Sequence, residues 1–289
     1  MKTPCRHAPA LLLPAIVLSA CGGVAPDFSP VADAMAQGLT CAITNCTESS
    51  TLNVDEISPQ FTVTQTDDEA QVVVEGSLGK SANLLTTVQP AANESLTASV
   101  DGGAEVAMAD VSGNRMRYKA TLRATSAQPV VRIVFTRAGV RHVSEATMPA
   151  RFTVLQPTGM AVLTRTSPDL PVRLTLSTMR DTSPAATGSC SRTDNSSFAV
   201  DGAALFYASE DSIAGGYRLV ASGVDDALNA ESRRANKDVA TTPLVSRCQL
   251  TVAWRHSGAS GTVAPTMNQH GFLRPTRVAT HALTYDGQR

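Results

Sequence analysis

The 289-residue sequence is poor in aromatic and charged side chains. Aromatic residues make up 4% of the chain, with a single tryptophan, and Asp, Glu, Lys and Arg together make up 17%. Coiled coils and disordered chains carry more charge, so the composition excludes both classes. The formal net charge is -1 and no cluster of Lys and Arg breaks the balance, so we expect no nucleic-acid partner. Thr, Val, Ala and Ser are abundant instead, which favours strands joined by turns.

Long apolar runs are also missing after residue 20, where no stretch reaches the roughly 18 residues that a membrane-spanning helix requires. The first twenty residues differ from the rest. Lys2 and Arg6 precede an apolar stretch from Ala8 to Ala20, and no acidic residue occurs there. The stretch is too short to span a bilayer and ends in small residues, so it predicts a secretory signal peptide over residues 1–20.

The end of this signal, Leu18-Ser19-Ala20-Cys21, resembles the lipobox of bacterial lipoproteins. The resemblance implies that the chain is cleaved before Cys21, that the Cys21 thiol carries a diacylglyceryl group, and that its new amino group is usually acylated too. Each buried methylene of such chains contributes about 0.8 kcal/mol, so the predicted partner is a membrane, bound through the acyl chains on Cys21. An ordinary signal peptide with a cysteine at its cleavage point is the alternative.

The residue after Cys21 is Gly22. In lipoproteins of Gram-negative bacteria an Asp at this position commonly retains the protein at the inner membrane. The resemblance therefore implies a lipid-anchored protein of the bacterial cell envelope, at the outer membrane.

Four cysteines remain once Cys5 is removed with the signal and Cys21 is assigned to lipid. An even number in an oxidising compartment predicts two disulfides. The pairing that keeps each bond local joins Cys41 to Cys46 and Cys190 to Cys248. A zinc site is the alternative, but the spacing lacks two short cysteine pairs.

The organisation along the chain predicts an all-β protein with two sandwich domains. Residues 21–56 form a lipidated tether with a short helix after Ser29-Pro30 and the Cys41–Cys46 loop. Residues 57–156 alternate with period two and predict seven strands, at 61–65, 70–76, 83–89, 95–101, 117–123, 130–135 and 150–156. This domain resembles an immunoglobulin- or fibronectin-type β-sandwich, in architecture only, because no Cys or Trp falls within it.

The predicted second domain, residues 157–289, follows Gln156-Pro157 and is a less regular β-sandwich. Its strands are expected at 160–164, 170–177, 203–208, 216–222, 248–256 and 278–285, with a surface helix over 225–240 that starts at an Asp cap. The Cys190–Cys248 bond is expected to join a long polar loop to a central strand.

Motifs that suggest chemistry have competing structural interpretations. The Gly79-Lys80-Ser81 sequence lacks the earlier glycine of a nucleotide-binding loop, so a β-turn is expected there. His256 and His281 lie on apolar faces of their predicted strands, and both would point to one side if the strands pair; a metal or catalytic pair is the alternative to rim or core histidines.

For three further features, too, a structural role is weighed against a chemical one. No Gly-x-Ser-x-Gly elbow occurs. The acidic runs at 67–69 and 225–226 are expected in turns or helix caps, with calcium as the alternative. Trp254 shares a face with Leu250 and Val252, which favours a core role over sugar stacking. We therefore assign no catalytic, metal-binding or cofactor-binding residue and expect no cofactor.

The function that this organisation favours is non-catalytic. Sandwich domains commonly present loops or sheet edges to partners, so a binding, adhesion or scaffolding role toward a protein or an envelope polymer is expected. The alternative is a hydrolase acting on an envelope or extracellular polymer, which an exposed aromatic row with adjacent carboxylates would indicate.

Overall fold

The computed structural model describes residues 45–66, 70–81, 83–176, 182–210, 213–237 and 242–289. The predicted signal peptide, the lipobox with Cys21, the tether helix and Cys41 lie outside these residues. Within them, no helix combines the length and the apolar character needed to cross a bilayer.

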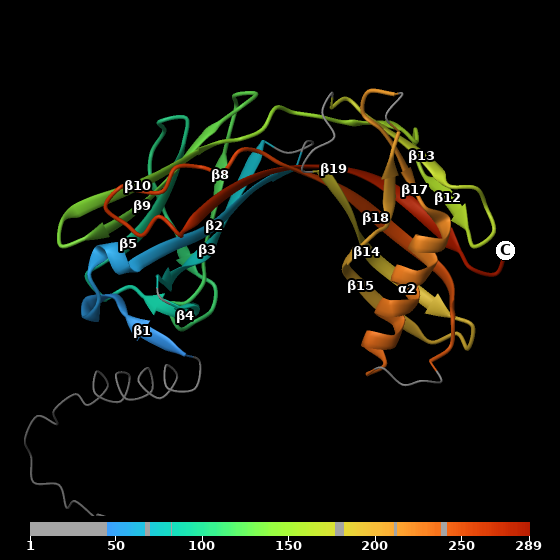
Figure 1. Ribbon diagram of the computed structural model, residues 1–289, viewed down its shortest axis with the longest axis horizontal. Helices are drawn as coiled ribbons and strands as arrows, with labels where there is room; N and C mark the ends of the chain where they lie inside the picture. Colours follow the sequence, from blue (N-terminus) through green and yellow to red (C-terminus); the bar gives the residue numbers. More distant parts are fainter. Residues whose placement is uncertain (1–44, 67–69, 82, 177–181, 211–212, 238–241) are drawn as a thin grey trace, which may run out of the picture.

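An eleven-stranded sheet runs through the whole described chain (Figure 1). Its strands follow the order β1-β4-β3-β2-β19-β18-β14-β15, while β12 adds to β19, β8 adds to β3 and β7 adds to β8. The strands on the N-terminal side are β1 (Cys46–Glu48), β2 (Ile57–Thr66), β3 (Gln71–Lys80), β4 (Asn83–Gln89), β7 (Ala109–Asp110) and β8 (Tyr118–Arg123). The others are β12 (Ala161–Thr164), β14 (Thr182–Arg192), β15 (Ser197–Ala204), β18 (Val245–Ser257) and β19 (Phe272–Asp286).

The C-terminal strand β19 joins the two halves of this sheet. Its first part, Phe272–Val278, pairs in parallel with Gln60–Thr66 of β2. Its last part, from Leu283, pairs in parallel with β12, and β18 runs antiparallel along its other edge. The strand β19 therefore belongs to both halves, and it runs across the top of the arch that links them (Figure 1).

The first half of the sheet is covered by a second sheet of order β10-β9-β5-β6. Its strands are β5 (Ser95–Val100), β6 (Val106–Ala107), β9 (Val130–Arg137) and β10 (Val140–Thr147). Between the two sheets lies a core of fully buried side chains such as Phe61, Val74 and Phe135. Alternating apolar residues on both sheets make this first sandwich, because one face of each strand is removed from water.

The second half is covered by a sheet of order β11-β13-β17-β16 together with one helix. These elements are β11 (Val154–Gln156), β13 (Leu170–Leu174), β16 (Tyr207–Ser209), β17 (Gly216–Leu219) and α2 (Ala221–Ala235). Trp254 is completely buried here, with its ring centroid 5.0 Å from that of Tyr217. The expected core role of Trp254 is confirmed.

The fold class, all-β with two sandwiches, is thereby confirmed, but the sandwiches are not separate. The chain leaves the second core after β18 and returns to the first, where Val263, Ala264, Met267 and Leu273 are buried in the core. The predicted boundary assigns all of residues 157–289 to the second domain, whereas these four residues belong to the first core. Because β19 contributes Leu273 to the first core and Leu283 to the second, both cores lie on the same face of the large sheet.

Most predicted strands are confirmed, and several features differ from expectation. The short strands β1, β6 and β7, the strands β10 and β14, and most of β15 were not predicted. The strand expected at 203–208 is wrong, because these residues end β15 and begin β16, which belong to different sheets. Cys190 lies inside β14 rather than in a polar loop. The turn predicted at Gly79-Lys80-Ser81 comes later than expected, because β3 continues to Lys80 and the chain turns at Ser81. A side chain in place of Gly76 would lie 2.1 Å from the Gln60 carbonyl oxygen, so this glycine permits close strand contact rather than a turn.

The helix is confirmed but starts at Ala221 instead of residue 225. Its capping carboxylate comes from elsewhere in the chain: the Ala221 amide donates to Asp169 Oδ1 at 3.1 Å. Sequence-local capping signals therefore placed its start one turn too late.

Candidate functional site

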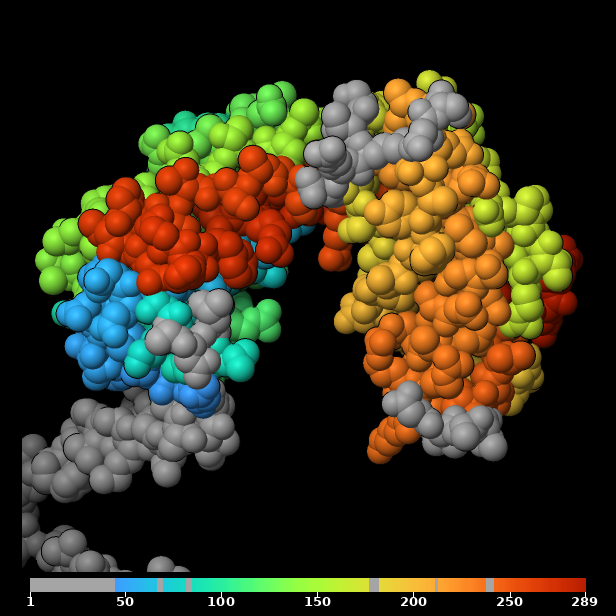
Figure 2. All heavy atoms as spheres, viewed as in Figure 1, coloured from blue at the N-terminus to red at the C-terminus, as the bar shows by residue number. Residues whose placement is uncertain are grey.

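The face of the large sheet opposite the two cores is uncovered at the centre of the arch. A trough of about 560 Å³ crosses it there, lined by residues of β2, β3, β14, β18 and β19. The lining residues are Thr62, Thr64, Thr66, Glu75, Ser183, Arg255, Ser257, Arg274, Thr276 and Val278. Figure 2 shows the two lobes standing apart beneath the arch, so this inner face is open to solvent between them.

Strand alternation explains why the trough is polar. In β2 the residues Phe61 and Val63 enter the first core, and the alternate residues Thr62 and Thr64 point to the other face. In β19 the same alternation buries Arg277 and leaves Thr276 facing the trough. The hydroxyl-rich lining is thus the outer half of strands whose inner half forms the cores.

A second hollow of about 710 Å³ adjoins the trough and shares Ser183, Ser257 and Arg274 with it. It extends past the start of β14 to Tyr207 and is bordered by residues 257–260. Together the two hollows form one continuous polar surface, which we call the arch trough.

The charge of the arch trough comes from two arginines. Its carboxylate, Glu75, is ion-paired with Lys119 at 2.7 Å. Arg274 packs its guanidinium 5.1 Å from the centre of the Phe272 ring and lines both hollows. Arg255 is exposed on β18.

The opposite face of the same strands carries a buried polar row. Gln65, Arg277 and His256 are partners in register across β2, β19 and β18. Arg277 is fully buried, and its guanidinium donates to the carbonyl oxygens of Ala127 and Pro149 at 2.6 and 3.0 Å. This row supports the floor of the trough, since it ties the shared strand to the chain segments that cover it.

The histidines predicted as a candidate pair lie on paired strands. His256 is partly buried, with Nδ1 3.1 Å from the hydroxyl of Thr182. His281 is buried opposite Val252, and desolvation lowers its pKa to about 4. In the described part of the chain, no group of three or more His, Cys, Asp or Glu side chains could hold a metal ion.

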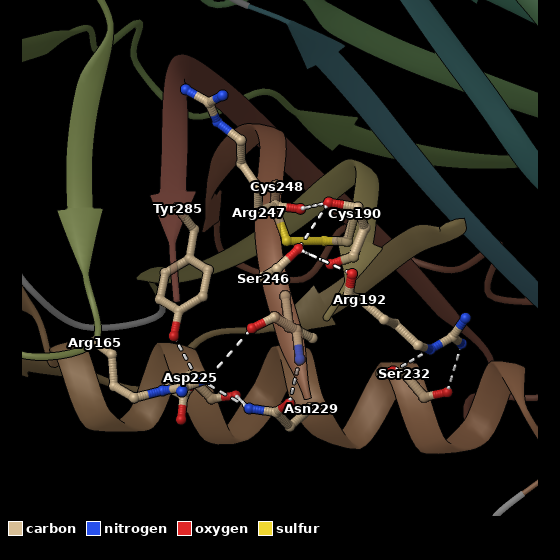
Figure 3. The surroundings of a disulfide bond; sticks show 12 residues. Arg165, Cys190, Arg192, Asp225, Asn229, Ser232, Ser246, Arg247, Cys248 and Tyr285 are labelled. Carbon is tan, nitrogen blue, oxygen red and sulfur yellow. Dashed lines mark hydrogen bonds and ion pairs between the residues drawn. A yellow bond between two sulfur atoms is a disulfide. The ribbon is translucent and has the colours of Figure 1, made fainter. Parts of the chain in front are cut away.

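The predicted disulfide between Cys190 and Cys248 is confirmed. The two residues are directly opposite one another on the antiparallel strands β14 and β18, with their Cα atoms 4.0 Å apart (Figure 3). Cys46 is also disulfide-bonded, while its predicted partner Cys41 lies outside the described residues. The Cys190–Cys248 bond joins two strands of the large sheet within the second core and does not face the arch trough.

Asp225, considered for calcium, holds the second lobe together instead. Its Oδ1 accepts hydrogen bonds from Arg165 at 3.1 Å, from Asn229 at 2.9 Å and from the Tyr285 hydroxyl (Figure 3). Burial raises the pKa of Tyr285 well above its usual value, and the Asp225 carboxylate adds to the rise. This cluster fixes α2 to β19, and Asp225 Oδ1 is already occupied by its three partners.

Sequence reasoning missed the arch trough. Its threonines could have been found as the outward residues of confirmed strands, as at positions 62, 64 and 66. The pairing of β19 with β2, which brings Thr276 beside Thr64, has no local signal because more than two hundred residues separate them.

No protein-family model and no curated protein matches the sequence. Among solved structures, titin domains Z1Z2 in complex with telethonin are similar at 12% identity and a TM-score of 0.22, over 81% of this chain and 96% of that chain. The Yersinia pseudotuberculosis adhesin InvE matches at 12% identity and a TM-score of 0.22, over 77% of this chain and 58% of that one. The BSP domain of a biofilm associated protein matches at 10% identity and a TM-score of 0.23, over 80% and 30% respectively. At these scores the likeness adds no argument to the architecture described above.

Proposed function

We propose that this protein is a lipid-anchored, non-catalytic binding protein of the bacterial cell envelope and that the arch trough is its binding surface. The observation that carries the proposal is the open, hydroxyl-rich face at the centre of a sheet shared by two sandwiches. Because β19 lies in both sandwiches, the side chains from both halves are held in one fixed surface. A preformed surface loses little conformational freedom when a ligand binds.

The chemistry of the lining favours binding over hydrolysis. Hydrolysis of a glycosidic bond ordinarily employs two carboxyl groups on either side of the bond. Among the described residues that line the arch trough, Glu75 is the carboxylate, and it is ion-paired with Lys119. No observation at the site therefore favours the hydrolase, and we do not propose it.

Crosslinking in the protein's own cells tests the binding surface. A photoreactive amino acid placed at Thr276, in the floor of the trough, is expected to capture an envelope component upon irradiation. The matched control carries the same group at Val140, which is 56% exposed at the start of β10 and does not line the trough. Equal capture from both positions, or capture only from position 140, would contradict the proposal.

The anchor has a separate test. Replacing Cys21 by Ser is expected to abolish incorporation of labelled fatty acid and to release the protein from the membrane fraction, because the thiol is the acylated group in the resemblance to lipoproteins. Undiminished labelling of the Cys21→Ser variant would exclude the anchor and leave the trough proposal unaffected.

A further inference from the structure

The side chains of the arch trough indicate the chemical class of its ligand, on the condition that the trough is the binding surface proposed above. Six of the ten residues that line the main hollow are Ser or Thr. A hydroxyl donates one hydrogen bond and accepts up to two, so this lining suits a ligand that itself carries many hydroxyl groups. Thr62 contributes acceptor capacity, since its hydroxyl donates to the Glu75 carbonyl oxygen at 3.3 Å. Val278 is the single aliphatic residue in this lining. The surface is therefore matched to a polyol rather than to an apolar ligand.

The two arginines favour a ligand that carries negative charge at two separated points. Arg255 is in register with Val278, and Arg274 lies four residues before Val278 on the neighbouring strand. Four residues of a strand span about 13 Å, so the two guanidinium groups start from well-separated positions. A small anion would reach one of them. A polymer with repeated negative charges would reach both.

A peptide partner fits this surface poorly. In the floor, β2, β19 and β18 have hydrogen-bonded strands on both sides. At Ser183 the outer edge of β14 is occupied in another way, because the carbonyl oxygens of Thr182 and Pro184 accept from the Tyr207 hydroxyl and the Leu205 amide. A peptide therefore finds no free strand edge in the trough onto which it could add. Nucleic acid fits poorly as well, because it calls for a dense basic surface and stacked aromatic rings, whereas the whole chain carries a net charge of -1.

From these observations we infer that the arch trough binds an acidic polysaccharide, a chain of sugars that bears carboxylate groups. The Ser and Thr hydroxyls meet the sugar hydroxyls along the floor. The Arg255 and Arg274 guanidinium groups meet successive carboxylates, for which their planar fork of donors is suited. The trough crosses five strands, or four strand spacings of about 4.8 Å, and so accommodates a segment of chain rather than a single sugar.

The test measures binding of the full chain in detergent to polygalacturonate, and to the same polymer after its carboxylates have been reduced to alcohols. We expect the reduced polymer to bind at least about tenfold more weakly, and binding of the acidic polymer to weaken as salt is raised. Arg255→Gln and Arg274→Gln should each weaken binding of polygalacturonate by about tenfold, since each removes a charge-assisted contact. Arg173→Gln, an exposed arginine of β13 outside the trough, is the matched control and should bind like the wild type.

The outcomes separate this inference from the proposed function. If wild type binds both polymers equally, and Thr276→Trp abolishes that binding, the trough is a binding surface but the requirement for acidic groups is wrong. If polygalacturonate binds and neither the arginine variants nor Thr276→Trp weakens it, the trough itself is wrong. Absence of binding to polygalacturonate, or tighter binding of a single-stranded DNA oligonucleotide, would overturn the inferred ligand class.

Discussion

Arg277 Nε donates a hydrogen bond to the carbonyl oxygen of Pro149 at 3.0 Å. Arg277 lies on the strand that both sandwiches share, and Pro149 lies on the segment that connects them, between β10 and β11. Arg277 Nη2 bonds the Ala127 carbonyl as well, so one buried side chain ties the connection to the centre of the sheet. The fixed form of the arch trough depends on this tie, because the same strand supplies Thr276 to the floor.

Replacing Arg277 by Met should destabilise the protein by about 3 kcal/mol, because hydrogen bonds from a charged donor contribute roughly 1.5–3 kcal/mol each and two carbonyls lose their partner. Denaturant unfolding of the purified chain measures the change. Arg173→Gln is expected to stay within about 0.5 kcal/mol of wild type, as an exposed substitution. A loss below about 1 kcal/mol for Arg277→Met would show that the tie is not a main support of the arch.

Gly76→Ala should destabilise the first sandwich by about 3 kcal/mol through overpacking. The added Cβ would lie 2.1 Å from the Gln60 carbonyl oxygen and 2.6 Å from Phe61 Cδ1, so β2 and β3 would have to separate. The control is Gly113→Asn, at a turn with nothing within 4 Å and a φ of +71° that Asn tolerates. Comparable stability of Gly76→Ala and Gly113→Asn in thermal melts would refute the close strand contact.

Removing the Cys190–Cys248 bond with the double variant Cys190→Ala/Cys248→Ala should lower the free energy of unfolding by roughly 4 kcal/mol, the chain-entropy value for a 58-residue separation. Reductant should lower the stability of the wild type by more than that of the double variant, in which the Cys46 bond is the remaining described disulfide. The bond would be contradicted if both thiols of the native protein reacted with an alkylating reagent after unfolding without reductant.

The buried His281 makes stability depend on pH. Desolvation lowers its folded pKa to about 4, below the ordinary value of 6.5, so the unfolded chain binds a proton more readily. Its contribution to stability is therefore complete above pH 6.5 and declines as pH falls toward 4, by roughly 2 kcal/mol at pH 5. His281→Leu should remove this decline, as measured by denaturant unfolding at pH 7.5 and pH 5. An equal loss of stability on acidification in wild type and variant would exclude His281 as its source.

How far the sequence predicts this structure depends on where its signals lie. Strands with clear alternation, such as β8 around Tyr118 and Leu122, are identified by pattern alone because one face is buried. β14 was missed because its small residues, from Thr182 to Arg192, show little apolar alternation; its place is set by β18 and β15 on either side. The core histidine and tryptophan positions were predicted because each shares a face with aliphatic neighbours.

The arch trough was out of reach for a different reason. Its floor requires the parallel pairing of β19 with β2, between residues at opposite ends of the described chain, and such pairing leaves no mark on a local stretch. The sequence around Arg277 also predicts an exposed polar segment, because a buried arginine is rare. Its burial is explained only by the backbone carbonyl oxygens to which it donates, and these lie far away in the sequence.

The central claim is that the arch trough is the binding surface, and blocking it tests this most directly. Thr276→Trp fills the floor of the trough, and Thr147→Trp adds the same side chain at an exposed position of β10 as the control. The measurement is co-sedimentation of each folded variant with cell-envelope material prepared from the protein's own cells. We predict that Thr276→Trp loses co-sedimentation while Thr147→Trp keeps it, with both variants within about 1 kcal/mol of wild-type stability. Retention by a stably folded Thr276→Trp would contradict the account.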